Sequence, residues 1–212
     1  MQDLKYHTLY KQSLHDKILQ AAMEMFVCKG IRAVKMDDIA TALTISKRTL
    51  YEIFRDKEDL LLACMTASLN YKKERVKHIV EHLDNVMDIV VAICELQLED
   101  VKKINPVFIS DLARYPRVYQ FLMKEEEQTA EQTKSFFNRG AQEGYFLDFV
   151  NYDLIVSLLE AQRKYVIGVE LYRQFNFSDL FLNMTVVPLR GFCTEKGIRK
   201  LDEFLKKAQV NK

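Results

Sequence analysis

Three consecutive side chains with the chemistry of DNA recognition, Lys47, Arg48 and Thr49, follow directly after Ser46. Arginine is the side chain that most often contacts guanine edges, threonine contacts either base type or a thymine methyl group, and lysine suits guanine or phosphate. Because Ser46 is a favourable N-cap, the three residues are expected in the first turn of a helix. Cations at this end oppose the helix dipole, so they indicate a polyanionic partner rather than a contribution to helix stability.

Two further residues extend this candidate surface. Tyr51 and Lys57 are expected to contact phosphate groups, which fix the position of a protein on DNA without reading its sequence. The alternative is the solvated face of an ordinary small helical domain. Each residue alone fits that alternative, and it is the whole pattern that favours DNA.

Two short helices must position these side chains. Apolar residues recur at helical spacing in both of them, as Met36, Ile39, Ala40 and Leu43 in the first and Leu50, Ile53 and Phe54 in the second. Thr44 and Ile45 form the predicted turn between them. A helix, a turn of three or four residues and a second helix make a helix-turn-helix unit, whose second helix enters the major groove of DNA.

The same stretch resembles the DNA-binding domain of the tetracycline-repressor (TetR) family over about residues 13–62. The resemblance rests on Phe26, Gly30, the block Met36-x-x-Ile39-Ala40, the block Ser46-Lys47-x-Thr49-Leu50-Tyr51-x-x-Phe54 and the block Lys57-Glu58-x-Leu60. It implies a homodimeric transcriptional regulator, usually a repressor that a small ligand releases from its operator. Double-stranded DNA, a second copy of the chain and an unknown small-molecule effector are therefore the expected partners.

There are three departures from the family pattern, the third of which is Glu52-Ile53 in place of a frequent His-Tyr. Lys35 stands where the family usually has a phosphate-contacting threonine, and it could serve a phosphate electrostatically. Thr44 replaces the usual glycine of the turn, where a threonine at positive φ would be strained. Glu52 adds a negative charge to the predicted recognition helix, which suggests an unusual operator. The candidate DNA-contacting residues are Lys35, Thr44, Ser46, Lys47, Arg48, Thr49, Tyr51 and Lys57.

Composition favours an all-α protein. Forty-nine per cent of the 212 residues are hydrophobic, and there are only six glycines and three prolines, fewer than the turns of a sheet protein need. The net charge is +1, whereas residues 29–57 hold seven Lys or Arg and four Asp or Glu, a net charge of +3. Any affinity for DNA must therefore come from a local patch.

Cysteine usage and hydropathy indicate a cytoplasmic protein. The cysteines are Cys28, Cys64, Cys94 and Cys193, which are widely spaced, as in reduced proteins with buried thiols. A redox sensor is a weaker alternative. The sequence has neither an apolar signal core near residue 1 nor the run of about 18 apolar residues that a membrane span requires.

Helix signals continue along the whole chain. A loose arm is expected over residues 1–12, followed by a helix that Ser13 caps and Gly30 ends. A long uninterrupted helix is expected from Lys57 to His82. The later helices are expected over 86–104, 107–114, 117–143 and 153–175, then from Ser178 with a break or kink near Pro188, and finally after Gly197.

We therefore predict two parts, a three-helix DNA-binding domain with the helix-turn-helix at residues 1–56 and a helical ligand-binding and dimerisation domain at residues 57–212. The candidate pocket residues are Met65, Met87, Cys94, Phe108, Tyr115, Phe121, Met123, Phe137 and Tyr165. The helix around Leu154 and the helix at Phe181–Phe192 have apolar residues on more faces than one core needs, which favours a four-helix bundle across a two-fold axis over a deeper core within one chain. The candidate dimer-interface residues are Ile155, Leu158, Leu159, Phe181, Met184 and Leu189.

One motif suggests different chemistry. His78, Glu81 and His82 match the HxxEH pattern of inverted zinc peptidases, although the sequence does not identify a third ligand and the motif lies at the charged end of a helix. Nothing resembles a phosphate-binding glycine loop or a nucleophile elbow, so we expect no catalytic residue, cofactor or metal. Two alternatives stay open, a DNA-binding dimer that acts through a protein partner and a zinc enzyme.

Overall fold

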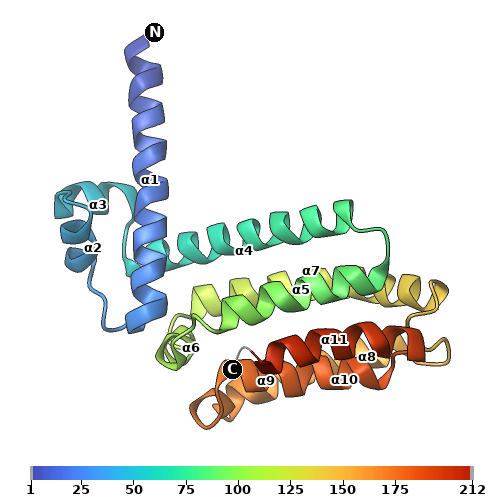
Figure 1. Ribbon diagram of the computed structural model, residues 1–212. Helices are drawn as coiled ribbons and strands as arrows, with labels where there is room; N and C mark the ends of the chain where they lie inside the picture. The colour runs from blue at the N-terminus through green and yellow to red at the C-terminus, as the bar shows by residue number, and fades with distance from the viewer. Residues whose placement is uncertain (1, 211–212) are drawn as a thin grey trace. The chain divides into compact units, whose positions relative to one another are not determined.

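The computed structural model describes residues 2–210, and the side-chain surroundings of residues 12–208 apart from 126, 127 and 130. Its elements are α1 (Gln2–Lys29), α2 (Met36–Ala42), α3 (Lys47–Ile53), α4 (Lys57–His82), α5 (Val86–Val101), α6 (Pro106–Leu112), α7 (Pro116–Gln142), α8 (Tyr152–Gly168), a 3₁₀ turn η1 (Leu171–Arg173), α9 (Phe177–Phe181), a π-helical turn η2 (Leu182–Val186), α10 (Val187–Gly191) and α11 (Glu195–Val210) (Figure 1). Apart from one isolated bridge between Phe146 and Cys193, all regular structure in the described residues is helical. The predicted all-α class is confirmed.

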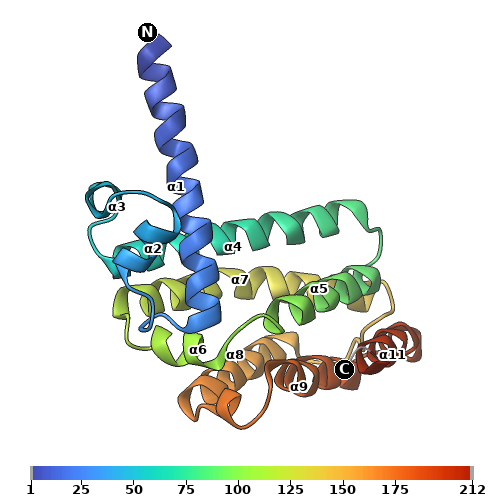
Figure 2. The same cartoon turned by 60° about the vertical axis from the view of Figure 1, so that its left-hand side comes forward.

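The chain divides into two compact units, of which the first contains the chain up to Lys72 together with Ile104–Met123. This division by packing differs from the boundary expected at residue 56, because the start of α4 and all of α6 share a core with the three N-terminal helices. The fully buried side chains of that core include Ile18, Phe26, Ile39, Leu50, Leu60 and Leu61. Figures 1 and 2 both show α2 and α3 beside α1.

Helix α1 begins earlier than the sequence signals predict. The structure has it running from Gln2, so the expected arm over residues 1–12 and the expected cap at Ser13 are wrong for the residues described. Residues 2–12 contain neither glycine nor proline, and an exposed serine does not end a helix. The predicted end is confirmed, since Gly30 follows the helix with φ of +84°.

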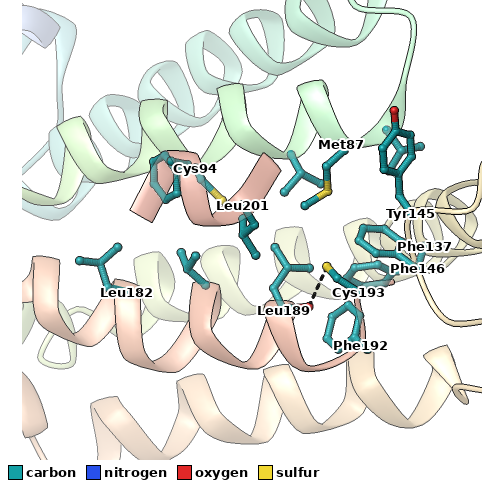
Figure 3. Close-up of a cluster of buried hydrophobic side chains, with 14 of the residues drawn as sticks. Met87, Cys94, Phe137, Tyr145, Phe146, Leu182, Leu189, Phe192, Cys193 and Leu201 are labelled. Atoms are coloured by element: carbon teal, nitrogen blue, oxygen red, sulfur yellow. Dashed lines mark hydrogen bonds between the residues drawn. The ribbon is translucent and has the colours of Figure 1, made fainter. Parts of the chain in front are cut away.

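The second unit contains Lys73–Lys103 and Lys124–Lys212. Helices α5 and α11 lie side by side in it (Figure 1). At the centre of its core, the rings of Phe146 and Phe192 lie 5.6 and 5.4 Å from the ring of Phe137 (Figure 3). Beside them, Cys193 Sγ donates to the carbonyl oxygen of Leu189 at 3.2 Å.

Two features of the second unit bear on the helices predicted from the sequence, the end of α8 and the irregular stretch before Pro188. Helix α8 ends at Gly168 rather than near residue 175, because Glu170 takes a φ of +52° and starts the turn η1. Near Pro188, where a break or kink was predicted, the chain stays helical but is irregular, since the π-helical turn η2 leads directly into α10. Proline has no N–H to donate to the preceding turn, which accounts for the irregularity.

None of the helices within residues 2–210 is long and apolar enough to cross a membrane.

Candidate nucleic-acid interface

Helices α2 and α3 form the predicted helix-turn-helix unit, and local contacts explain how it folds. Ser46 Oγ accepts the backbone N–H of Thr49 at 3.0 Å, which confirms the predicted N-cap of α3. Leu50 is fully buried and Phe54 nearly so, which fixes the face of α3 that meets the core. The opposite face, with Lys47, Arg48 and Tyr51, is exposed to solvent.

The turn between the two helices depends on Thr44. Its φ is +55°, in the left-handed region that favours glycine, and the backbone N–H of Ile45 reaches back to the carbonyl oxygen of Ala40 at 3.0 Å. The strain expected for a β-branched residue at this position is therefore present. The turn keeps its geometry because both flanking helices are anchored in the core.

We expect Thr44→Gly to raise the free energy of unfolding by about 1 kcal/mol, since glycine adopts this conformation without a steric cost. Denaturant unfolding of the full-length protein measures the change. Thr41→Gly, at an exposed position inside α2, is the matched control and should lower the free energy by about 1 kcal/mol. Equal destabilisation by both substitutions would contradict the strain.

All three exposed charged residues on α3, Lys47, Arg48 and Glu52, have oppositely charged partners within the chain. Lys47 Nζ lies 2.8 Å from Asp37 Oδ1 on α2, and the hydrogen bond to Asp37 raises the pKa of Lys47 above its ordinary value. Arg48 Nε donates to Glu52 Oε1 at 2.9 Å. Lys47 also lies 5.9 Å from the centre of the Tyr51 ring. The surface is thus a mixed one, in which carboxylates hold the cations in place.

Asp37→Asn should release Lys47 and tighten binding to any duplex by a few-fold. If Lys47 then gains one phosphate, the slope of log affinity against log salt becomes steeper by about 0.9. A salt titration of duplex binding by the variant and the parent protein measures both effects. An unchanged slope together with unchanged affinity would show that Lys47 does not face the DNA.

Lys57 differs most from its predicted role. Its ammonium group donates to the carbonyl oxygens of Ile31 and Val34, at 2.7 and 2.8 Å, and is partly buried. Burial lowers the pKa of Lys57. The structure thus places this side chain under the loop between α1 and α2, where it holds the backbone that leads into the helix-turn-helix unit. Lys35, by contrast, is exposed, and its backbone N–H is capped by Asp38 Oδ2 at 2.8 Å.

The loop between α1 and α2 has a second anchor, which the sequence did not predict. Asp111 on α6 is only 5 % exposed, and its Oδ2 accepts the backbone N–H of Arg32 at 2.8 Å. Asn105 donates from Nδ2 to the carbonyl oxygen of Cys28 at 2.9 Å. In the sequence, Asn105-Pro106 predicts only the start of a helix. The contacts of Asn105 and Asp111 with this loop could not be predicted, because the backbone groups that they bind lie more than 70 residues earlier in the chain.

The candidate pocket residues divide between the two units. Met87, Cys94 and Phe137 belong to the buried core of the second unit, whereas Tyr165 is exposed on α8. In the first unit, Phe108 is buried, Met65 and Tyr115 pack against the same core, and Phe121 and Met123 are partly buried. Their role in binding a ligand stays a prediction.

The candidate dimer-interface residues also occupy different environments. Phe181 and Leu189 are buried in the core of the single chain, and Ile155 and Leu159 pack against that core, so these four are occupied within one copy. Met184 is partly buried and Leu158 is exposed. The face of α8 that remains free of the core instead holds Leu154, Leu158, Tyr165 and Val169, all at least 45 % exposed.

The other residues considered for chemistry are the histidines of the HxxEH motif and the cysteines. The rings of His78 and His82 stack with centroids 3.9 Å apart, and His82 Nδ1 lies 2.8 Å from the carbonyl oxygen of His78. Within the part of the chain that the structure describes, no group of three or more His, Cys, Asp or Glu is placed to hold a metal ion. Burial raises the pKa of Cys64, Cys94 and Cys193 to about 12, so these thiols are protonated at neutral pH.

Two short helices joined by a tight turn, the second with one buried face and with Lys47, Arg48 and Tyr51 on the other, are the arrangement found in helix-turn-helix DNA-binding proteins. Comparison with known proteins narrows the class. Residues 18–64 match the family described as bacterial regulatory proteins, tetR family. Residues 18–64 therefore carry the DNA-binding domain typical of TetR-family transcriptional regulators.

Individual relatives agree with this assignment. The chain is 26 % identical over 153 residues, 69 % of its own length and 76 % of the relative's, to the HTH-type transcriptional repressor KstR2 of Mycobacterium tuberculosis. The structure of the ketosteroid transcriptional regulator KstR2 from that organism matches with a TM-score of 0.56 at 21 % identity, covering 85 % of this chain and 95 % of that one.

Two further solved structures share the fold. A TetR-family regulator from Agrobacterium tumefaciens matches with a TM-score of 0.69 at 14 % identity, covering 86 % of this chain and 99 % of that one. A regulator from Saccharomonospora viridis, solved in complex with choline, matches with a TM-score of 0.64 at 18 % identity, covering 92 % and 96 %.

Proposed function

We propose that this regulator is a repressor that binds a near-palindromic operator as a homodimer and leaves it when a small molecule binds the second unit. The observation that carries the proposal is the division of α3 between a buried face, centred on Leu50, and an exposed face with Lys47, Arg48 and Tyr51. Two copies of α3 would enter successive major grooves about 34–36 Å apart, or a multiple of that distance.

The exposed face of α8 supports the homodimer. Leu154, Leu158 and Tyr165 are 56, 55 and 59 % exposed and recur at helical spacing along one side. Water-exposed leucines in a row are unfavourable in a monomer, and contact with the same row on a second copy would remove them from water. Val187 of α10 is also exposed and is a further candidate for this interface.

An effector would act by binding two conformations of the dimer with different affinity, because only that difference can shift the population. Met87, Cys94 and Phe137 supply an apolar, polarisable environment in the second unit, which suits an apolar molecule. The KstR2 structure is of a ketosteroid regulator, so a steroid is the first apolar probe, and choline, with which another similar structure was solved, is a cationic probe for comparison.

Selection of genomic fragments by the purified full-length protein tests the proposal, with the region upstream of its own gene included. The expected result is enrichment of a near-palindromic motif and a complex of two chains per duplex. Steroid or choline probes should release the DNA if their class is right. Enrichment with no release by any small molecule would favour action through a protein partner, and no enrichment would refute the DNA-binding role.

A further inference from the structure

One exposed ion pair on α3 lies on the face that the core leaves free. Arg48 Nε donates to Glu52 Oε1 at 2.9 Å, across one turn of the helix. The two side chains are 88 and 60 % exposed. The bond uses the single Nε–H of the guanidinium group and leaves its two terminal amino groups for other acceptors.

Helix stability does not explain this pair. Arg48 lies in the first turn of α3 and Glu52 near its end, so each charge opposes the end of the helix dipole that it faces. The order of the two residues is also the less favourable one, because an acid placed before the base stabilises a helix more. Exposed pairs of this kind contribute little in any case. The pair therefore calls for an explanation outside the helix.

A carboxylate on a surface that approaches phosphates lowers affinity for every DNA sequence. It can compensate by positioning a cation that contacts DNA and by accepting hydrogen bonds from base edges, and in the major groove glutamate accepts from the N4 amino group of cytosine. The terminal amino groups of arginine donate to O6 and N7 of guanine. Arg48 and Glu52 together therefore present donors beside an acceptor, the complement of the major-groove edge of a G·C pair.

We propose that Glu52 is a specificity-determining residue and that the Arg48–Glu52 pair reads G·C in each half-site. Arg48 donates to the guanine, and Glu52 accepts from the cytosine of the same or the adjacent pair. Glu52 also holds the guanidinium group in position before DNA binds, so less side-chain freedom is lost in the complex. This inference rests on the proposed DNA-binding function.

The test is selection from randomised duplexes by the full-length protein and by Glu52→Gln, followed by competition binding at the selected position. The parent protein should prefer G·C to A·T there by about tenfold. Glu52→Gln should lose that preference or reverse it towards A·T, because glutamine pairs with adenine. It should also bind unrelated duplexes more tightly, since a negative charge is gone.

Three further variants complete the experiment. Arg48→Ala should lose the guanine preference, and Glu52→Asp, which keeps the carboxylate, should retain part of the cytosine preference. Glu99→Gln removes the same charge from an exposed position on α5 and should select the parent motif. If the parent protein selects a motif and Glu52→Gln selects the same one with the same ratios, the inference is wrong and the proposed function stands. If the parent protein selects nothing, both fail.

Discussion

Leu158→Glu is expected to convert the proposed homodimer into a monomer and to lower operator affinity by more than a hundredfold. Leu158 is 55 % exposed within the apolar face of α8, and two-fold symmetry would place the new charge in the interface twice. Burying an unpaired carboxylate costs several kcal/mol. A monomer then has one α3 for each operator and loses the gain from linking two half-sites.

Sedimentation at micromolar concentration and operator titration measure the two consequences. The fold should survive, because Leu158 lies outside the core of the single chain. Gln132→Glu is the control, since it adds the same charge at an exposed position on α7 and should remain dimeric. A dimeric Leu158→Glu variant with parental affinity would show that α8 is not the interface.

The second large effect is expected at Lys57. Lys57→Met should lower the free energy of unfolding by about 2 kcal/mol, because the carbonyl oxygens of Ile31 and Val34 lose a charged donor. Methionine keeps the length of the side chain, so lost hydrogen bonds rather than lost volume dominate the effect. Affinity for all duplexes should fall by about tenfold, since the loop that leads into α2 is no longer held.

Denaturant unfolding and duplex binding, measured on the same variant, separate this role from the direct phosphate contact predicted by the sequence. A residue that only contacts phosphate would change affinity and its salt dependence but not stability. Arg55→Met is the matched control, because Arg55 is an exposed cation two residues earlier, paired with Asp56. It should leave stability within about 0.5 kcal/mol of the parent. Equal stability of both variants would restore the phosphate-contact role.

Local signals predicted those parts of the fold whose contacts are local. The N-cap of α3 is a hydrogen bond between Ser46 and Thr49, three residues apart, and the end of α1 needs only Gly30 at positive φ. Both were predicted correctly. For Thr44, the comparison with the usual turn glycine indicated only that a positive φ would be strained, and the structure gives it a φ of +55°.

Contacts between residues far apart in the sequence could not be predicted in this way. Lys57 is an exposed cation by its type, and only the fold brings it under Ile31 and Val34. Asp111 and Arg32 are 79 residues apart in the sequence. The end of α8 was predicted too late for a related reason, since Glu170 carries no sequence signal for its left-handed conformation.

The most direct measurement of the central claim is competition between a selected duplex and a random-sequence duplex for the full-length protein at physiological ionic strength. If α3 reads base edges, the selected duplex should bind at least about a thousandfold more tightly. Arg48→Ala should reduce that ratio by about ten- to a hundredfold, while binding to random duplex weakens by no more than the few-fold expected from the loss of one positive charge. Equal affinity of the parent protein for both duplexes would contradict the account.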